Sequence, residues 1–191
     1  MQELIRANSL EDAKITAYHI GFVLGPCINA SGRLDTAARS LALLNAKTKE
    51  EAARLAGDLT ALNQSRKALT EKGKEEAIRI IETTELKNDR VLVVYLPDCH
   101  ESLAGIIAGR IREKYHRPAF VLTGGETSAK GSGRSIESYS MYEELVKCAD
   151  LMIQFGGHPM AAGLSIEEKN IEEFRRRLNV NCTLTDEELR P

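Results

Sequence analysis

The chain has 191 residues, of which 42% are hydrophobic and 28% charged, the composition of an ordinary globular protein. Its 26 Lys and Arg against 28 Asp and Glu leave a net charge of −2, which excludes a uniformly basic nucleic-acid binder. No apolar run approaches the ~20 residues of a membrane span, and the polar first residues predict no signal peptide. The four cysteines form no CxxC pair, which disfavours a zinc ribbon. Together these features predict a cytoplasmic protein that does not bind a membrane.

A glycine-containing segment, GFVLGPCINASGR, dominates the first 35 residues. Gly25 followed by Pro26 predicts a turn or loop. Such a loop would bring the polar side chains of Asn29, Ser31 and Arg33 together. A structural hinge is an equally good interpretation.

A long helix is predicted to follow. Asp35 is the expected N-cap of a helix over residues 36–45. Thr48, with Glu51 three residues later, forms a capping-box pattern, and apolar residues then recur at helical spacing. A helix of roughly 30 residues is about 45 Å long, a length that suits a linker between two bodies.

The second half alternates between strand and helix patterns. Its β-branched and apolar runs predict strands, and its runs with apolar residues every three or four positions predict helices. The order β-α-β-β-α-β-α indicates a two-layer α/β domain from about residue 89 to residue 178. The strands are expected at 91–96, 118–123, within 128–136 and at the end of 155–166, and the helices at 102–115, 140–151 and 170–178.

The segment Gly131–Ser135, GSGRS, is a candidate anion site. Two glycines would let backbone N–H groups approach a phosphate, and Arg134 and Ser135 would add donors. A glycine-softened turn with an exposed arginine is the slightly favoured alternative. The surrounding stretch from Arg110 to Arg134 has six Lys and Arg and two Glu, a local charge of +4.

A second glycine segment, GGHPMAAG, places His158 after two glycines in a predicted loop. Such a histidine can donate to phosphate or transfer a proton near neutral pH, although a lone histidine is more often structural. His100 and Glu101 stand where a strand meets a helix N-terminus, a place that favours anions. No zinc motif or catalytic triad is present. The residues alone therefore favour phosphate or nucleic-acid contact over catalysis.

Four segments in this order and spacing resemble a known family: GFVLGPCINASGRLD, HESLAGIIAGRIREKYHRP, KGSGRS and FGGHPMAAGLS. They are similar to the C-terminal half of the core of RecJ-type single-stranded-DNA-specific exonucleases, of the DHH/DHHA1 phosphoesterase superfamily. The resemblance covers essentially the whole chain. It implies an α/β fold with a DHHA1-type mixed sheet and flanking helices, preceded by a long linker helix. The implied domains are a C-terminal remnant of a DHH domain at 1–34, connecting helices at 35–88, the DHHA1 domain at 89–180 and the start of an OB-fold segment at 181–191.

The resemblance also implies an activity: 5′→3′ hydrolysis of single-stranded DNA in repair and recombination. Mn²⁺ or Mg²⁺ would be held by a DHH domain absent from this chain, which itself would bind no metal and be inactive. Cys27 departs from the residues usual in the family, which puts one contact in doubt. His158 would assist at a phosphate. The residues implied to contact nucleic acid are Asn29, Arg33, Arg110, Lys130, Gly131, Ser132, Gly133, Arg134, Ser135, Gly156, Gly157 and His158.

The implied partners are single-stranded DNA and, for the intact protein, a single-strand-binding protein and a helicase. The sequence carries no signal for an oligomeric state. One alternative is an oligoribonuclease or cyclic-dinucleotide phosphodiesterase of the same superfamily, which would share the GGH segment. Another is a non-catalytic interaction or dimerisation module, in which the helix over residues 48–82 would form the interface.

Overall fold

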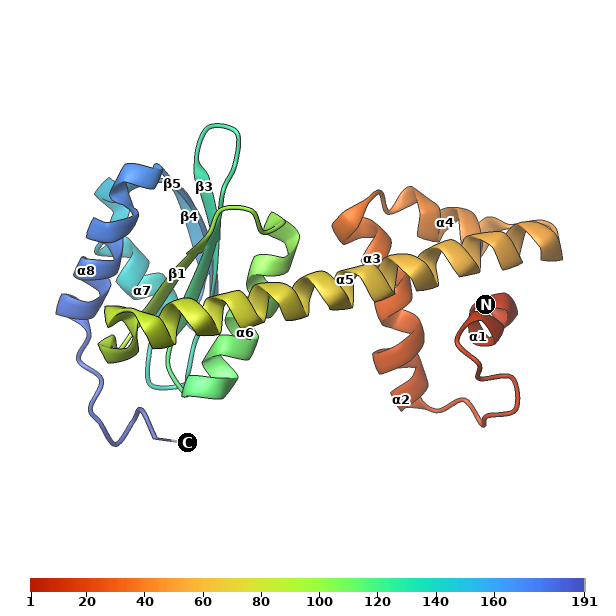
Figure 1. Cartoon of the computed structure of the whole chain (residues 1–191), viewed down its shortest axis with the longest axis horizontal. Coiled ribbons are helices and arrows are strands. Elements are labelled where there is room, and N and C mark those ends of the chain that lie inside the picture. Colours follow the sequence, from red (N-terminus) through yellow and green to blue (C-terminus); the bar gives the residue numbers. More distant parts are fainter. Residues whose placement is uncertain (191) are drawn as a thin grey trace. The chain divides into compact units, whose positions relative to one another are not determined.

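The structure is a computed structural model that describes residues 1–190 (Figure 1). Its chain contacts define two compact units, one ending at Leu69 and the other starting at Thr70. The boundary falls inside the long helix α5 (Lys49–Thr83). No helix among residues 1–190 is both long enough and apolar enough to cross a membrane.

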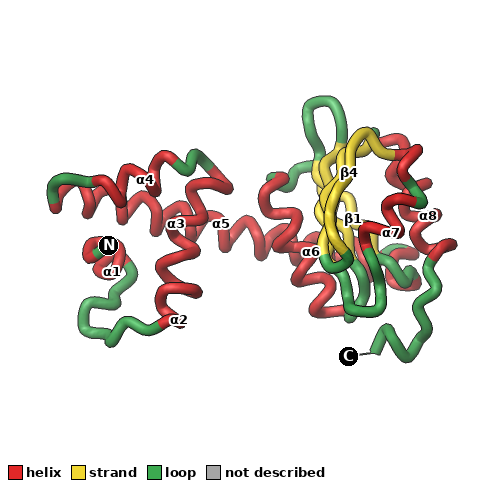
Figure 2. Tube along the Cα trace, turned by 180° about the vertical axis from the view of Figure 1, so that it is seen from behind, coloured by secondary structure: helices red, strands yellow, loops and turns green. Residues whose placement is uncertain are grey.

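The described elements of the first unit are helices joined by loops (Figure 2). Its core is formed by buried side chains from α1, from the region around α3, from α4 and from the first turns of α5, with Leu4, Cys27 and Leu59 fully buried. Its elements are α1 (Gln2–Ala7), α2 (Ala17–His19), the π-helical turn η1 (Ile20–Leu24), α3 (Gly25–Leu34), α4 (Ala38–Asn45) and the start of α5.

The loop predicted at Gly25 and Pro26 is wrong, because both residues lie in the first turn of α3. Residues 17–34 form one continuous helical run, and Pro26 lies just after the π-helical turn η1, in which the Gly25 N–H bonds to the carbonyl of Ile20; such a widened turn accommodates a residue that has no N–H. Gly25 is needed for packing, because a Cβ would lie 2.8 Å from the carbonyl oxygen of Ile20. The predicted N-cap is also wrong: Asp35 ends α3, and α4 begins at Ala38 after Ala37.

The predicted long helix is confirmed as α5, with 35 residues. Its start is capped by Thr48, whose Oγ1 accepts the N–H of Glu51 at 3.2 Å. Gly73, which interrupts the apolar pattern of the sequence, lies where α5 approaches α6 (Glu101–Tyr115). A Cβ at Gly73 would stand 2.6 Å from Ile107 Cδ1, so the glycine allows the two helices to pack closely.

The second unit is built on a five-stranded mixed sheet with the order β1-β2-β3-β5-β4. Only β1 and β2 pair in parallel, and the other pairs are antiparallel. Helix α6 lies against one face, and α7 (Met141–Val146) and α8 (Ile171–Asn181) lie against the other (Figure 1). The strands are β1 (Leu92–Leu96), β2 (Ala119–Thr123), β3 (Ala129–Arg134), β4 (Met152–His158) and β5 (Ala161–Ile166), and short 3₁₀ turns lie at Glu85–Asn88, Ala149–Leu151 and Glu168–Asn170.

This sheet has one strand more than the sequence predicted. The segment read as a loop followed by a strand is a hairpin of β4 and β5. The turn lies at Pro159 and Met160, between two strands rich in glycine and alanine. Those residues have low strand propensity, so β4 could not be predicted from its own sequence. It forms a strand because it pairs with β5 in the sheet.

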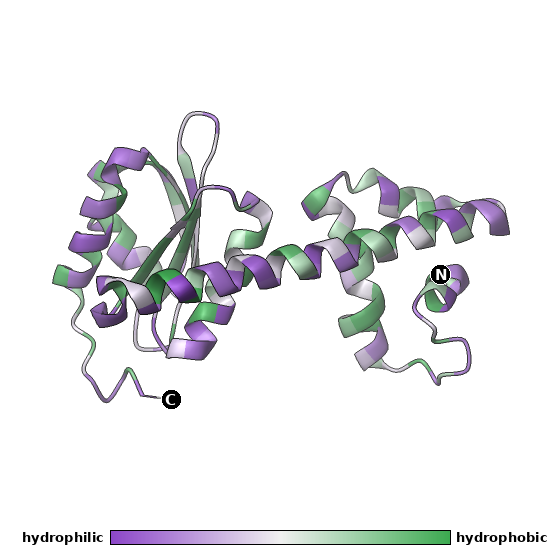
Figure 3. Cartoon of the chain, in the orientation of Figure 1, coloured by the Kyte–Doolittle hydropathy of each residue, from purple (hydrophilic) through white to green (hydrophobic). Residues whose placement is uncertain are grey.

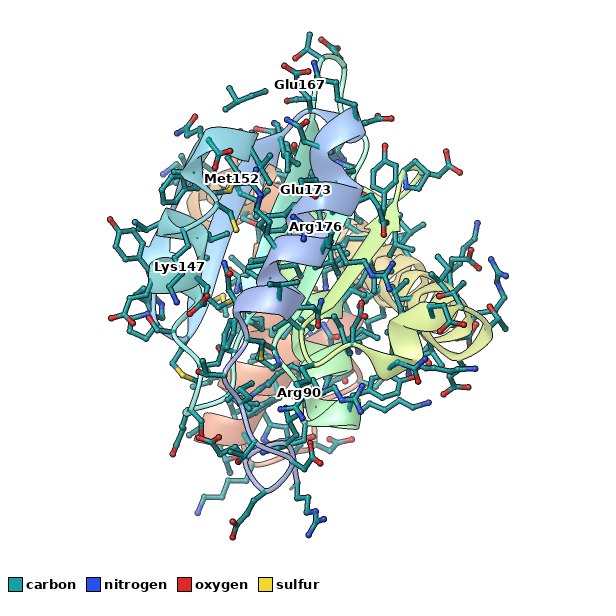
Figure 4. All side chains as sticks on the ribbon, turned by 90° about the vertical axis from the view of Figure 1, so that its left-hand side faces the viewer. Arg90, Lys147, Met152, Glu167, Glu173 and Arg176 are labelled. Carbon is teal, nitrogen blue, oxygen red and sulfur yellow. The ribbon has the colours of Figure 1, made fainter. Side chains whose placement is uncertain are left out.

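The main core of the second unit lies between the sheet and the helices α7 and α8. Phe120 on β2 and Phe174 on α8 are fully buried and meet edge to face, with ring centroids 5.4 Å apart. Figure 3 shows the strands coloured hydrophobic and the outer side of α8 hydrophilic. On that outer side, Glu173 and Arg176 form an ion pair of 2.6 Å (Figure 4).

Helix α8 is tied to the start of β1 by side-chain bonds. The Asn179 Oδ1 accepts the N–H groups of Arg90 and Val91, and its Nδ2 donates to the Val91 carbonyl. Arg175 and Asp89 form a largely buried ion pair at 2.6 Å. These contacts fix the layer of α7 and α8 behind the sheet, and on the opposite face α6 packs against β2 and β3.

Candidate nucleic-acid interface

One face of strands β3, β5 and β4 carries polar and small residues in register. Alternate residues of a strand point to opposite faces, so three cross-strand rows lie on this side. We call it the open face. Its rows are Lys130–Ser165–Gln154, Ser132–Gly163–Gly156 and Arg134–Ala161–His158.

A groove of about 590 Å³ runs over the open face. On one side it is bordered by the first turn of α6, through Glu101, Ser102 and Ala104. On the sheet it is lined by Lys130, Gly131 and Ser132 of β3, Gln154, Phe155 and Gly156 of β4, and Gly163, Leu164 and Ser165 of β5. A groove floored by three strands and open to solvent suits an extended ligand better than an enclosed small molecule.

The segment predicted as a glycine loop, Gly131–Ser135, is the strand β3 continued by one residue, so the loop prediction is wrong. A side chain at Gly131 or Gly133 would point into the core. A Cβ at Gly133 would stand 2.5 Å from Met141 Sδ and 2.6 Å from Phe120 Cε1. These two glycines therefore make room for core side chains and do not form a phosphate cradle.

Ser132 and Arg134 lie on the open face, whereas Ser135 does not. The Ser135 side chain is 1% exposed, and its hydroxyl donates to the Tyr139 carbonyl at 2.6 Å. Arg134 is partly buried, and its Nη1 donates to the Gly133 carbonyl at 2.7 Å. The structure therefore gives Ser135 a role in the turn after β3.

The GGH segment ends β4, and its three residues have different surroundings. Gly157 has φ +155°, and a Cβ there would lie 2.5 Å from the Ala161 carbonyl oxygen, so the backbone requires glycine. No atom lies within 4 Å of a Cβ built at Gly156. His158 is exposed, and its Nδ1 accepts the N–H of Met160 at 3.3 Å, which leaves Nε2 to carry the proton of a neutral ring.

Gly163, which faces Gly156 across the hairpin, is also uncrowded. A Cβ there would find its nearest atom, the carbonyl oxygen of Gly131, at 3.8 Å. Neither glycine of this pair is needed for packing inside the protein. Together they leave a bare patch of peptide backbone at the centre of the open face, where a ligand can approach closely.

The local +4 charge of the sequence does not form one basic surface. Arg110, which is exposed on α6, pairs with Glu113 at 2.9 Å, and Arg117 donates to the carbonyls of residues 87 and 89. Lys130 on the open face pairs with Glu101 at 2.6 Å, with both side chains about half exposed. Lys130 is therefore the cation that lines the groove, and Arg134 is a second cation on the open face.

The predicted site residues of the first unit lie on α3. Asn29 and Arg33 are exposed and one helical turn apart, while Ser31 is buried and bonded to Ser40 at 2.7 Å. Burial, followed by the nearby charge of Arg33, lowers the pKa of Arg66 on α5. Arg66 also donates to the Asn63 Oδ1 at 3.0 Å. Nothing local in the sequence indicates that Arg66 lies near Arg33, because that proximity is tertiary.

Several groove residues were missed at the sequence level. Glu101 was noted only as part of a helix start, and Gln154, Gly163 and Ser165 were not singled out. The alternation of AAGLSI, read as a strand, would have placed Gly163 and Ser165 on one face. Among residues 1–190, no group of three or more His, Cys, Asp and Glu side chains lies close enough to hold a metal ion.

Comparisons with known proteins show which family the chain resembles in sequence and fold. Residues 88–182 match the DHHA1 domain. The chain is 40% identical to the single-stranded-DNA-specific exonuclease RecJ of Salmonella typhimurium, over 93% of this chain and 32% of that protein. The crystal structure of RecJ from Thermus thermophilus in complex with Mg²⁺ has a TM-score of 0.82 and 30% identity, over 94% of this chain and 28% of that one. The Mn²⁺ complex of the same protein has a TM-score of 0.80 and 30% identity, over 94% and 27%.

The chain spans about a third of the length of the Salmonella protein. The similarity extends over both units and includes the helix α5, because it covers nearly all of the chain. The chain belongs to the RecJ family, with its DHHA1 domain at residues 88–182.

Proposed function

We propose that the open face binds the sugar-phosphate backbone of single-stranded DNA, as the DHHA1 part of a single-stranded-DNA exonuclease. One observation carries the proposal: the bare backbone of Gly156 and Gly163 lies between rows that hold Lys130, Arg134 and His158. The family membership supports this reading, since the related protein is a single-stranded-DNA-specific exonuclease.

Each polar group has a distinct part in this proposal. Lys130 and Arg134 neutralise phosphates, and Arg134 offers a planar fork that suits phosphate oxygens. His158 donates from Nε2 to a phosphate oxygen, because Nδ1 already accepts the Met160 N–H. Ser132 adds a hydroxyl donor between the two cations.

The binding should be mainly electrostatic. Of the described residues that line the groove, Phe155 is the one aromatic, and it also packs against the core. Base stacking on aromatic rings therefore contributes little. Phosphate contacts release counterions, so the affinity should fall steeply with salt.

We further propose that this chain binds and orients the strand while hydrolysis depends on Mg²⁺ or Mn²⁺ held elsewhere in the intact enzyme. The two Thermus structures support a metal-dependent enzyme. The described residues contain no cluster suited to a metal, so we assign this chain no step through the ion. The chain alone should bind DNA without cleaving it. The intact enzyme would act in the cytoplasm, in DNA repair and recombination.

The domain roles are likewise proposals. Residues 1–34 complete a DHH domain, residues 35–88 connect it to the DHHA1 domain, and residues 181–191 lead into an OB fold. Asn29 and Arg33 on α3 would make phosphate contacts within the first unit. A single-strand-binding protein and a helicase would be partners of the intact enzyme.

The first experiment is a fluorescence anisotropy titration of a labelled 12-nucleotide single strand with this chain over a salt series. We expect binding that weakens with salt. Arg134→Ala should lower the affinity and reduce the slope of log K against log salt by about 1. Equal binding of a 12-base-pair duplex, or no binding at low salt, would contradict a single-strand site on this chain.

A second experiment separates this function from a dinucleotide-cleaving enzyme of the same superfamily. The full-length protein with Mn²⁺ should degrade long single strands much faster than dinucleotides. Preference for dinucleotides would favour the alternative. Cleavage by the 191-residue chain alone, abolished by His158→Ala, would overturn the assignment of a binding role only.

A further inference from the structure

The side chain of Arg134 follows an unusual course along α6. Its Cγ lies 3.9 Å from the point where a Cβ on Gly109 would be. Its guanidinium lies at Gly105, one turn earlier, where a built Cβ would be 2.7 Å from Nη2 and 3.3 Å from Cζ. The three nearest atoms that a Cβ on Gly105 would meet all belong to this guanidinium.

This course moves the positive charge toward the groove. The Lys130–Glu101 pair shows that the start of β3 lies by the start of α6, so the direction from Gly109 to Gly105 leads back along β3. One helical turn is about 5.4 Å. Ala104, the neighbour of Gly105, lines the groove. The charge is thus displaced from the end of the strand toward Ala104 and the groove border.

The space for the guanidinium exists because residue 105 has no side chain. Glycine is a poor residue for a helix interior, so its presence here calls for a reason. On β3, the residues in register on either side of Arg134 are the small Ala119 and Ala161. The bond from Nη1 to the Gly133 carbonyl holds one edge of the fork at 2.7 Å. The strand β3, the helix α6 and the Gly133 carbonyl together fix the position of the Arg134 guanidinium.

We propose that Gly105 is a positioning residue: its missing side chain lets the Arg134 guanidinium lie against α6 at the groove border, where it receives a phosphate of the bound strand. The inference rests on the proposed function for its ligand. The placement of the guanidinium stands on its own geometry and can be measured without DNA.

The test compares Gly105→Ala with Gly109→Ala in the 191-residue chain. Both changes add a methyl group to the same helix. At residue 105 the methyl group must displace the guanidinium, the mobile end of a flexible side chain, whereas at residue 109 it makes an ordinary contact with Cγ. Both variants should therefore fold and melt no lower than the wild type, because alanine is favoured over glycine in a helix.

Two readouts decide the outcome. The Arg134 Nε–H resonance, identified by its loss in Arg134→Ala, should shift in Gly105→Ala and stay near its wild-type position in Gly109→Ala. Affinity for a labelled 12-nucleotide strand should fall about fivefold in Gly105→Ala and change less than about twofold in Gly109→Ala. The double variant Gly105→Ala/Arg134→Ala should bind no worse than Arg134→Ala alone, since coupled residues are not additive.

Each alternative result has a distinct meaning. An unshifted Nε–H resonance in Gly105→Ala would overturn the positioning role, whatever happens to binding. A shifted resonance with undiminished affinity, while Arg134→Ala weakens binding, would show that the position does not matter for the ligand and would also overturn the proposal. A shifted resonance in a chain that binds no strand at all would sustain the placement and refute the proposed function instead.

Discussion

The adjacent glycines of the GGH segment should respond oppositely to the same substitution. Gly156→Ala adds a methyl group where no atom lies within 4 Å, on the open face. Because glycine in a strand is less stable than alanine by about 0.5–1 kcal/mol, this variant should be as stable as the wild type or slightly more stable. Its methyl group, however, stands where the DNA backbone would approach.

Gly157→Ala should instead destabilise the fold. Its φ of +155° belongs to the region that side chains rarely adopt, which costs about 1–3 kcal/mol. The new Cβ would also lie 2.6 Å from Ala162 Cα, a backbone atom that cannot rotate away. We expect a total loss of about 2–4 kcal/mol, which lowers Tm by about 2–4 °C for each kcal/mol in a chain of this size.

Thermal unfolding and DNA anisotropy distinguish the two effects. Gly156→Ala should keep its Tm and lose about tenfold in affinity, which corresponds to about 1.4 kcal/mol, a typical value for a contact to a charged oxygen. Gly57→Ala is the matched control, since residue 57 on α5 is also uncrowded and lies outside the groove. The reasoning fails if Gly156→Ala melts as low as Gly157→Ala, or if it binds the strand as tightly as the Gly57→Ala control.

Three further changes test other parts of the structure. Gly133→Ala should cost about 1–3 kcal/mol in urea unfolding, because its Cβ would overlap Met141 Sδ, and a neutral result would contradict the core role of this glycine. Glu101→Gln should raise single-strand affinity about two- to fivefold at low salt by freeing Lys130, with the gain disappearing at high salt; unchanged affinity would remove Lys130 from the site. Tyr139→Phe should stabilise the fold by about 1 kcal/mol, since the buried hydroxyl has no partner among the described residues. Burial raises the pKa of the Tyr139 hydroxyl above its unfolded value near 10. The unfolded state therefore loses this proton first, and the free energy of unfolding falls by about 1.4 kcal/mol for each pH unit above 10. An alkaline unfolding curve that is identical in Tyr139→Phe would contradict this.

The parts of the fold that the sequence predicted are those with a strong local pattern. The run of β-branched residues at Leu92–Leu96 is a buried strand, and the regular spacing of apolar residues after Thr48 is the helix α5. In both cases the local preference and the tertiary packing agree. The pattern was sufficient because buried residues recur along each element, on both faces of the strand and at helical spacing in α5.

The errors arose where glycine and proline were read only as breaks. Gly25 and Pro26 lie inside a helical run, where the π-helical turn η1 passes into α3, and in β4 the glycines belong to a paired strand. In both places, neighbouring elements supply what local propensity lacks. Glycine identity alone does not say whether it serves a turn, a close core contact or a bare surface.

The sequence singled out some residues that share the open face, but it did not predict their arrangement. Lys130, Arg134 and His158 do share one face, although they were assigned to two separate loops. The pairing of β3 with β5 and of β5 with β4 brings them together, and strand pairing cannot be read from a single segment. The course of Arg134 along α6 depends on a helix packed across the sheet, at Gly105.

The alternation along β3 separates two kinds of constraint within six residues. Lys130, Ser132 and Arg134 lie on the open face, while Ala129, Gly131 and Gly133 face the core. In a saturation mutagenesis library, a selection for folding alone should reject changes at the odd-numbered positions and accept many at the even-numbered ones. A selection for DNA binding should reject both. In this short strand, the residues needed for folding and the residues proposed to bind the ligand therefore occupy alternate positions.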